Sequence, residues 1–282
     1  MISTAFDYQR ATSVDDALAK LGAGGAKLLA GGHSLIPLMK LRLSEPQVLI
    51  DISRIKELSG IRQSGGAIEI GAGTVHSEVA ASTLLRDACP VIAETAAEIG
   101  DPQVRNKGTL GGSLAHADPS ADYPATMIAL DAEIMIRGTQ GARSVKAADF
   151  FIDLFTVDLA PNELITGVKF TPVRSAAYAK LHQRASHFAI VGVAAALGVE
   201  GGVIKSARVG LTGAISHAVR LTNVEQALQG KQASAATIEA AAKVAAANLD
   251  GLNSDMHASA EYRQAMVGVF TRRALEKSLS RA

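Results

Sequence analysis

The chain has 282 residues, of which 48% are apolar and 20% charged, and its formal net charge at pH 7 is +1. This balance is typical of a globular protein and gives no reason to expect a polyanionic partner such as nucleic acid. The single cysteine, Cys89, excludes a disulfide framework and an iron–sulfur cluster held by this chain alone, which needs four thiolates. The first residues lack the features of a signal peptide, and the longest apolar run, 188–199, is too short to cross a bilayer. We therefore expect a soluble, cytoplasmic protein without a membrane span.

The first fifty residues predict an α/β unit. Apolar periodicity indicates a helix over Val14–Leu21, beginning after Ser13, and a shorter one over Ile36–Leu41. The apolar runs Lys27–Ala30 and Gln47–Ile52 indicate buried strands. This alternation of helix and strand defines a first predicted subdomain, residues 1–55.

Hairpin patterns dominate the next predicted subdomain, residues 56–173. The predicted strands are Ile61–Gln63, Ala67–Ile70, Ala132–Arg137, Ala142–Val145 and Glu163–Phe170, and a helix is predicted over Val91–Ile99. Thr171-Pro172 marks the boundary to the remainder.

The last predicted domain, residues 174–282, combines a hairpin with helices. The strands Ala189–Val199 and Val203–Leu211 flank Glu200-Gly201-Gly202. Three helices are predicted over Asn223–Gln229, Ala235–Leu249 and Ser259–Ser280.

Two Gly-Gly motifs with similar flanks are the strongest binding signals. Leu28–Leu35 reads Leu-Leu-Ala-Gly-Gly-His-Ser-Leu, and Thr109–Leu114 reads Thr-Leu-Gly-Gly-Ser-Leu. Paired glycines let a ligand approach the main chain, and successive N–H groups with a nearby hydroxyl can bind an anion. One such motif is usually a plain turn. Two together suggest the halves of one site, such as one for the two phosphates of a dinucleotide.

The polar side chains outside these motifs leave several alternatives open. His116, Asp118 and Asp122 carry metal-ligand side chains, but their spacing matches no standard zinc or calcium loop. Asp122 instead suits a carboxylate that accepts ribose hydroxyls. His33 is either an acid–base group, a covalent flavin attachment point or a residue that binds only through its backbone. Lys180 either carries positive charge to a bound anion or lies on a solvated strand face.

Both motifs together resemble those of a known family. The stretches Ala30–Pro37 and Gly108–Pro119 are similar to the FAD-binding medium subunit of molybdenum hydroxylases, the xanthine oxidase family. The likeness is strongest to the medium chains of carbon monoxide dehydrogenase and of N-heterocycle oxidoreductases such as quinoline 2-oxidoreductase, and it covers nearly the whole chain. It implies an α+β fold: an FAD-binding domain of the PCMH/vanillyl-alcohol-oxidase type, built from two α/β subdomains, and a C-terminal α+β domain with an antiparallel sheet.

The resemblance also implies which residues bind the cofactor. The residues expected around the FAD pyrophosphate are Leu28, Leu29, Ala30, Gly31, Gly32, His33, Ser34, Leu35, Thr109, Gly111, Gly112 and Ser113. His116 and Asp122 are expected at the phosphate–ribose region, Ile99 near the isoalloxazine, Ile165 at the adenine, and Lys180 near the flavin. Many relatives have Asn where this chain has Ser113, whose hydroxyl still offers a hydrogen bond.

The implied function is electron transfer within a larger enzyme. Substrate is then oxidised at a molybdenum–pterin centre on a large subunit, and two [2Fe–2S] clusters on a small subunit pass electrons to non-covalently bound FAD, which reduces an external acceptor. A dimer of heterotrimers is expected, with no catalytic base and no metal on this chain. Two alternatives are a stand-alone flavin oxidoreductase, which would need a base that we do not find, and a binding module that has lost FAD.

Overall fold

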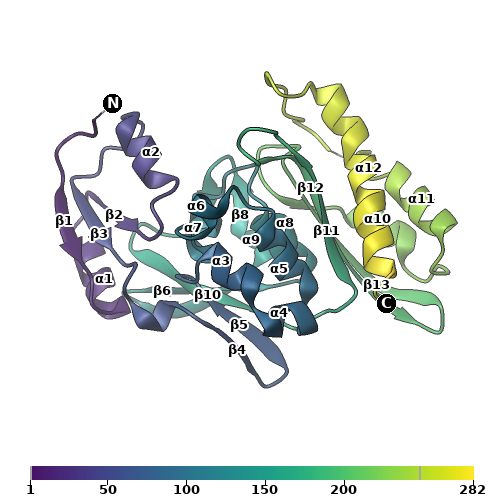
Figure 1. The fold of residues 1–282 in the computed structure, drawn as a ribbon, viewed down its shortest axis with the longest axis horizontal. Helices are drawn as coiled ribbons and strands as arrows, with labels where there is room; N and C mark the ends of the chain where they lie inside the picture. Colours follow the sequence, from purple (N-terminus) through teal and green to yellow (C-terminus); the bar gives the residue numbers. More distant parts are fainter. Residues whose placement is uncertain (1, 248) are drawn as a thin grey trace.

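The computed structural model describes residues 2–247 and 249–282. Met1 and Asn248, the latter within the helix predicted over Ala235–Leu249, lie outside the described part. The described chain forms three sheets and a two-stranded ribbon, with helices packed around them (Figure 1). The predicted α+β class is confirmed by this mixture of helices and mainly antiparallel sheets.

The N-terminal sheet is small and parallel. Its strands lie in the order β1 (Asp7–Arg10), β3 (Val48–Asp51) and β2 (Ala26–Leu29). Helix α1 (Val14–Leu21) begins where the Ser13 hydroxyl accepts a hydrogen bond from the Asp16 amide, as the sequence predicts. The strand β1 was not predicted, because all four of its residues are exposed and its sequence shows no alternation.

The middle sheet is antiparallel and has five strands. Their order is β4 (Ile61–Ser64), β5 (Ala67–Gly71), β10 (Glu163–Phe170), β6 (Glu133–Gly138) and β7 (Gly141–Lys146). The late strand β10 lies between the two hairpins, so residues about a hundred positions apart pair in the sheet, such as Val168 with Ile70. The short ribbon β8 (Phe151–Asp153) and β9 (Thr156–Val157) follows β7.

The third sheet, also antiparallel, separates two cores. Its strands are β11 (Ala176–His182), β12 (Ala189–Glu200), β13 (Val203–Thr212) and β14 (Val219–Arg220). Along β12, Val191 and Val193 belong to the C-terminal core, while Ala194 and Ala196 belong to the core of the middle domain. Side chains alternate across a strand, so both faces of this sheet are covered by helices, α12 on one and α5 and α8 on the other (Figure 1).

Helices occupy the segments between the strands. In the middle domain they are α3 (His76–Ala81), α4 (Thr83–Ala88), α5 (Pro90–Ala97), α6 (Pro102–Arg105), α7 (Leu110–His116), α8 (Tyr123–Ala129) and α9 (Ala147–Phe150). The others are α2 (Leu35–Lys40), the 3-10 turn η1 (Lys56–Leu58), α10 (Thr222–Leu228), α11 (Ala235–Lys243) and α12 (Ala260–Leu279). Helix α11 ends six residues before the predicted Leu249. None of the described helices is long and apolar enough to cross a membrane.

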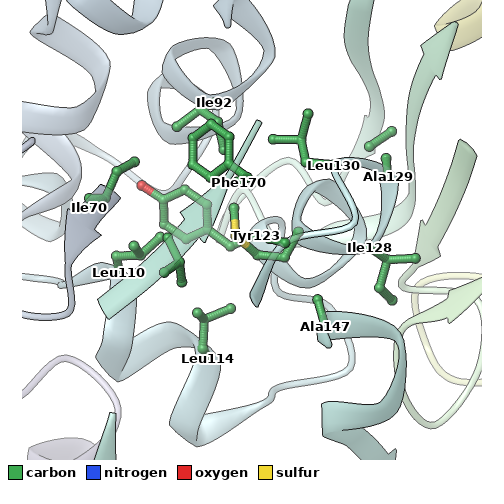
Figure 2. Close-up of a cluster of buried hydrophobic side chains, with 14 of the residues drawn as sticks. Ile70, Ile92, Leu110, Leu114, Tyr123, Ile128, Ala129, Leu130, Ala147 and Phe170 are labelled. Atoms are coloured by element: carbon green, nitrogen blue, oxygen red, sulfur yellow. The ribbon is translucent and has the colours of Figure 1, made fainter. Parts of the chain in front are cut away.

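The middle core is built around Tyr123, at the start of α8. Its ring lies among Ile70, Leu110 and Phe170, and all four side chains are buried (Figure 2). This core therefore joins β5, α7, α8 and β10, and it fixes α7 at its place beside the N-terminal sheet.

Candidate functional site

The first Gly-Gly motif forms an open loop at the carboxyl end of β2. Six consecutive amides, from Ala30 to Leu35, have no acceptor among the described residues. The next bond in the chain is from the Ile36 amide to the Gly32 carbonyl, which starts α2. His33 and Ser34 are exposed and the other residues of the loop are half-buried. A run of unpaired amides at this edge of a parallel sheet can bind an anion.

Gly31 brings the two motifs into contact. A Cβ on Gly31 would lie 2.0 Å from the Lys107 carbonyl oxygen and 2.9 Å from Cα of Gly108. Gly32 takes a φ of +77°, which favours glycine. The loop from Ala30 to Ser34 therefore lies directly against the segment that leads into the second motif.

The second motif forms the start of a helix, so it does not repeat the free amides that its likeness to the first motif predicts. Thr109 precedes α7, and its hydroxyl accepts from the Gly112 amide at 3.1 Å. The Leu110 and Gly111 amides donate to the carbonyls of Thr74 and Ala72. These amides are thus already paired, and the free amides for an anion come from the first motif.

The two glycines of the second motif differ in what a side chain would meet there. A Cβ on Gly111 would lie 2.5 Å from Cβ of Ala72, so this position is needed for packing. A Cβ on Gly112 would approach only the Thr109 hydroxyl, at 2.8 Å, and Gly112 is exposed. The half-buried Ser113 hydroxyl bonds to no described residue. The surface of α7 at Gly112 and Ser113 is therefore open to a ligand.

Histidine 76, which sequence reasoning missed, supports the contact between the motifs. Its amide donates to the Gly108 carbonyl at 3.0 Å, and its ring leaves no room for a side chain at Gly108, where a Cβ would lie 2.6 Å from Nε2. Burial, followed by the charges of His33 and Arg105, lowers the pKa of His76 to about 4. His76 is thus neutral at pH 7, beside the point where the two motifs meet.

Asp122 and Lys180 meet in a buried cluster. The Lys180 ammonium lies 2.9 Å from each Asp122 carboxylate oxygen, and the Tyr178 hydroxyl donates to the same carboxylate at 2.5 Å. The side chains are 4% exposed for Asp122 and 1% for Lys180, so Lys180 is not on a solvated strand face. Burial raises the pKa of Asp122 to about 6, against the opposing effects of Lys180 and Tyr178. Tyr178 was missed, although it shares a strand face with Lys180 at i, i+2.

Cationic donors also hold the end of α5. The Lys180 ammonium donates to the Glu98 carbonyl at 2.9 Å, and Arg105 donates to the carbonyls of Ile99 and Gly100 at 3.0 and 2.9 Å. Three successive carbonyls thus receive charged donors. The amides of Gly100 and Asp101 have no acceptor among the described residues, and they point away from these donors because C=O and N–H of a trans peptide are opposed.

A cavity of about 280 Å³ lies next to this turn. Its walls come from the end of α5, from α6, and from the loop between β11 and β12, and they include Glu98, Gly100, Asp101, Arg105, His182 and His187. Helix α6, one turn of about 6 Å, lines the cavity at both of its ends and is followed by Lys107–Gly108. The cavity thus runs along α6, and the loop with the free amides meets the chain just after this helix, at Lys107–Gly108.

The remaining predicted residues are placed separately. Ile99 is half-buried directly after α5, beside the cavity wall. The His116 ring packs on Phe155 with centroids 5.1 Å apart. Ile165 is 5% exposed in the middle core, paired with Ile136 across the sheet. Leu28 and Leu29 are half-buried on β2.

These features suit FAD. The free amides of the first loop match a pyrophosphate, the exposed Gly112 presents bare backbone on α7, and the cavity lies along the neighbouring α6. The donors are backbone amides and hydroxyls, which can hydrogen-bond the oxygens of a dianionic linker.

Comparison with known proteins supports FAD as the ligand of this site. Residues 4–173 match the model of the FAD binding domain in molybdopterin dehydrogenase, and residues 176–278 match the CO dehydrogenase flavoprotein C-terminal domain. The chain is 39% identical to the carbon monoxide dehydrogenase medium chain of Hydrogenophaga pseudoflava, over 100% of this chain and 99% of that one. It is 38% identical to subunit alpha of the 6-hydroxypseudooxynicotine dehydrogenase complex of Paenarthrobacter nicotinovorans, over 98% and 95% of the two chains.

Solved structures are similar over the same length. A structure of carbon monoxide dehydrogenase from Hydrogenophaga pseudoflava superposes with a TM-score of 0.96 over 100% of both chains, at 39% identity. Quinoline 2-oxidoreductase from Pseudomonas putida 86 gives a TM-score of 0.92 over 99% of both chains, at 32% identity.

The fold and the amide-lined loop define a dinucleotide-binding flavoprotein. The chain belongs to the family of FAD-binding medium subunits of molybdopterin dehydrogenases, so the predicted family, the predicted oxidoreductase class and the predicted FAD are confirmed.

Proposed function

We propose that this chain binds one FAD non-covalently and transfers electrons within a molybdenum hydroxylase complex. The observation that carries the proposal is the run of free amides from Ala30 to Leu35, held against Lys107–Gly108 by the absence of a side chain at Gly31. The family match supports the identity of the cofactor.

In this proposal the two motifs enclose the pyrophosphate. Residues 28–35 supply amides, and Thr109, Gly111, Gly112 and Ser113 supply a close surface and a hydroxyl. The isoalloxazine occupies the cavity beside Ile99. His116 and Ile165 keep their proposed places near the ribose and the adenine.

In this proposal, Asp122 and Lys180 support the site by fixing the turn 98–100. Their charged groups bond to each other, and Lys180 also fixes the Glu98 carbonyl. With Arg105, this holds the turn 98–100 in one conformation, and its free amides stay directed away from the core. We propose that these residues keep the cavity wall in place for the flavin.

Bound FAD supplies the ability to accept and release electrons singly or in pairs. We propose that electrons arrive from [2Fe–2S] clusters on a small subunit, after substrate oxidation on a large molybdopterin subunit, and leave to an external acceptor. The relatives named as medium chains and complex subunits support a multi-subunit assembly. A dimer of heterotrimers in the cytoplasm completes the proposal and is tested by the mass of the native complex and by cell fractionation.

The cofactor is tested by acid precipitation of the purified chain. We expect a yellow protein that releases its chromophore into the supernatant, with the mass of FAD and about one equivalent per chain. Chromophore retained on the pellet would show a covalent link, for instance at His33, and a colourless chain that takes up no added FAD would contradict the proposal.

The division of labour is tested by assaying the chain with and without co-purified partners. Aldehydes, purines, N-heterocycles and carbon monoxide should be oxidised only by the assembled complex. The isolated chain should transfer electrons only from a reduced cofactor to artificial acceptors. Substrate turnover by the isolated chain at the rate of the complex would favour a stand-alone oxidoreductase.

A further inference from the structure

The cavity beside α6 is lined by an acid–base pair. His182 Nε2 lies 3.0 Å from Glu98 Oε2, and the side chains are 41% and 44% exposed. Both residues also line the cavity. The pair is therefore accessible to solvent at the cavity wall, and its members are the residue that follows α5 and the last residue of β11.

Other charged groups surround this pair. Lys180 precedes His182 by two residues on β11, and behind it lies Asp122. His187 comes from the following loop, with ring centroids 6.2 Å apart, and has a φ of +60°, uncommon for a residue with a side chain. Asp101 and Arg105 of α6 complete the cavity wall.

We propose that His182, held by Glu98, takes up a proton from solvent whenever FAD bound in this cavity is reduced. The inference rests on the proposed function, since it places the flavin in the cavity. Two electrons enter the cofactor from a donor, one proton binds the flavin ring, and a second binds the His182 imidazole, which then donates to the Glu98 carboxylate. On oxidation by the acceptor, both electrons leave and both protons return to solvent.

The physical cause is the charge that the electrons add. Burial, then Lys180, lowers the pKa of His182, while Glu98 raises it. A negative charge gained in the cavity favours the protonated imidazole and so raises this pKa, against the net lowering by burial and Lys180. Linkage is reciprocal: if reduction raises the affinity for a proton, protonation raises the affinity for electrons by the same factor.

The inference is tested by measuring the midpoint potential of the FAD in the full-length chain as a function of pH. At pH values between the pKa of His182 in the oxidised protein and its pKa in the reduced protein, the potential should fall more steeply with rising pH. The additional fall should be about 30 mV for each tenfold decrease in proton concentration. His182→Asn should remove this steeper segment. Glu98→Gln should keep it but move it to lower pH, because the carboxylate no longer supports the imidazolium. The His182 pKa, followed by NMR, should also rise on reduction.

The matched control is His217→Asn, a histidine paired with Ser216 outside the cavity, which should leave the profile unchanged. Identical profiles for the wild type and His182→Asn would overturn this inference while leaving FAD binding intact. Loss of the segment in His187→Asn and not in His182→Asn would also overturn it. A chain that binds no FAD would instead contradict the proposed function, and with it this inference.

Discussion

Two glycines of the site lack a side chain for different physical reasons. At Gly31 the space that a Cβ would need is filled by a protein atom, the Lys107 carbonyl oxygen. At Gly112 the space is bounded by the protein only at the Thr109 hydroxyl, and the rest is open. Gly31 is thus needed to join the motifs, whereas Gly112 is needed only if a ligand lies over α7.

Alanine substitutions separate these reasons. Gly31→Ala should impose about 1–3 kcal/mol of overpacking strain on the loop, which corresponds to a loss of about fivefold to 150-fold in FAD affinity. Gly112→Ala should leave the free energy of unfolding nearly unchanged, because about 1 kcal/mol gained in helix propensity offsets a weakened cap. Its FAD affinity should nevertheless fall. Titration of each apo-protein with FAD, beside urea unfolding, measures both effects.

Ala115→Ser, at an exposed position of the same helix α7, is the control and should bind FAD as the wild type does. Wild-type affinity in Gly112→Ala would mean that nothing lies over α7 at this point.

His76 makes the stability of the chain depend on pH. Its folded pKa, about 4, lies below the ordinary value of 6.5, so between these values the unfolded chain binds more protons. Stability from His76 is therefore complete above pH 6.5 and is lost as the pH falls towards 4. Asp122, whose pKa burial raises to about 6, acts in the opposite direction over part of this range.

We expect His76 to remove about 2 kcal/mol from the free energy of unfolding between pH 7 and pH 5. Because other groups titrate as well, the measurement compares the wild type with His76→Leu by urea unfolding at both pH values. The variant should be less sensitive to pH by about that amount. Equal sensitivity of the two proteins would show that His76 is not held neutral by burial, and exposed His257→Gln serves as the control.

Elements with a strong local pattern could be predicted from the sequence. Helix α1 has its Ser13 cap, and β12 with β13 has long apolar strands around a Gly-Gly turn. In each case the residues that decide the structure are neighbours in the chain. The exposed strand β1 escaped because its partner β3 lies about forty residues further along the chain, and the predicted helix ran past the C-terminal end of α11 at Lys243.

Helix α7 shows the same limit at the candidate site. Leu110-Gly111-Gly112-Ser113 has weak helix propensity, and its helix is fixed by Ala72 packing on Gly111 and by carbonyls that accept its first amides. The glycines can be read from the sequence, whereas the residues that pack on them and accept their hydrogen bonds cannot. Resemblance to a family predicts the binding stretches, whereas the bonds of Asp122 with Tyr178 and Lys180 required the fold.

Across the whole molecule, this buried cluster connects the C-terminal domain to the FAD-binding domain. Tyr178 and Lys180 come from β11, Asp122 precedes α8, and the Glu98 carbonyl follows α5. A buried charge that loses its partner is costly, whereas an apolar pair of similar volume is often tolerated.

Lys180→Met should therefore destabilise the chain by about 3–5 kcal/mol even without FAD. The double variant Lys180→Met/Asp122→Leu should recover most of that loss. Urea unfolding of the apo-proteins in a double-mutant cycle measures the coupling. A loss only in FAD affinity, with apo stability intact, would show that Lys180 acts as a cofactor ligand and not as a link between domains.

The shared core of the third sheet limits how this chain can be divided. Alternate residues of β12 fill two different cores, and Gly210 of β13 lies so close to the Ala125 carbonyl that a Cβ would be 2.1 Å from it. Thr212 adds hydrogen bonds to the carbonyls of Pro119 and Ala121, both at 2.8 Å. In a chimaera that takes residues up to 173 from one homologue and the remainder from another, the side chains of β12 and β13 would thus no longer match the segment 119–125 on which they pack. The two parts match separate family models, yet a substitution on one side of this interface requires a compensating substitution on the other side.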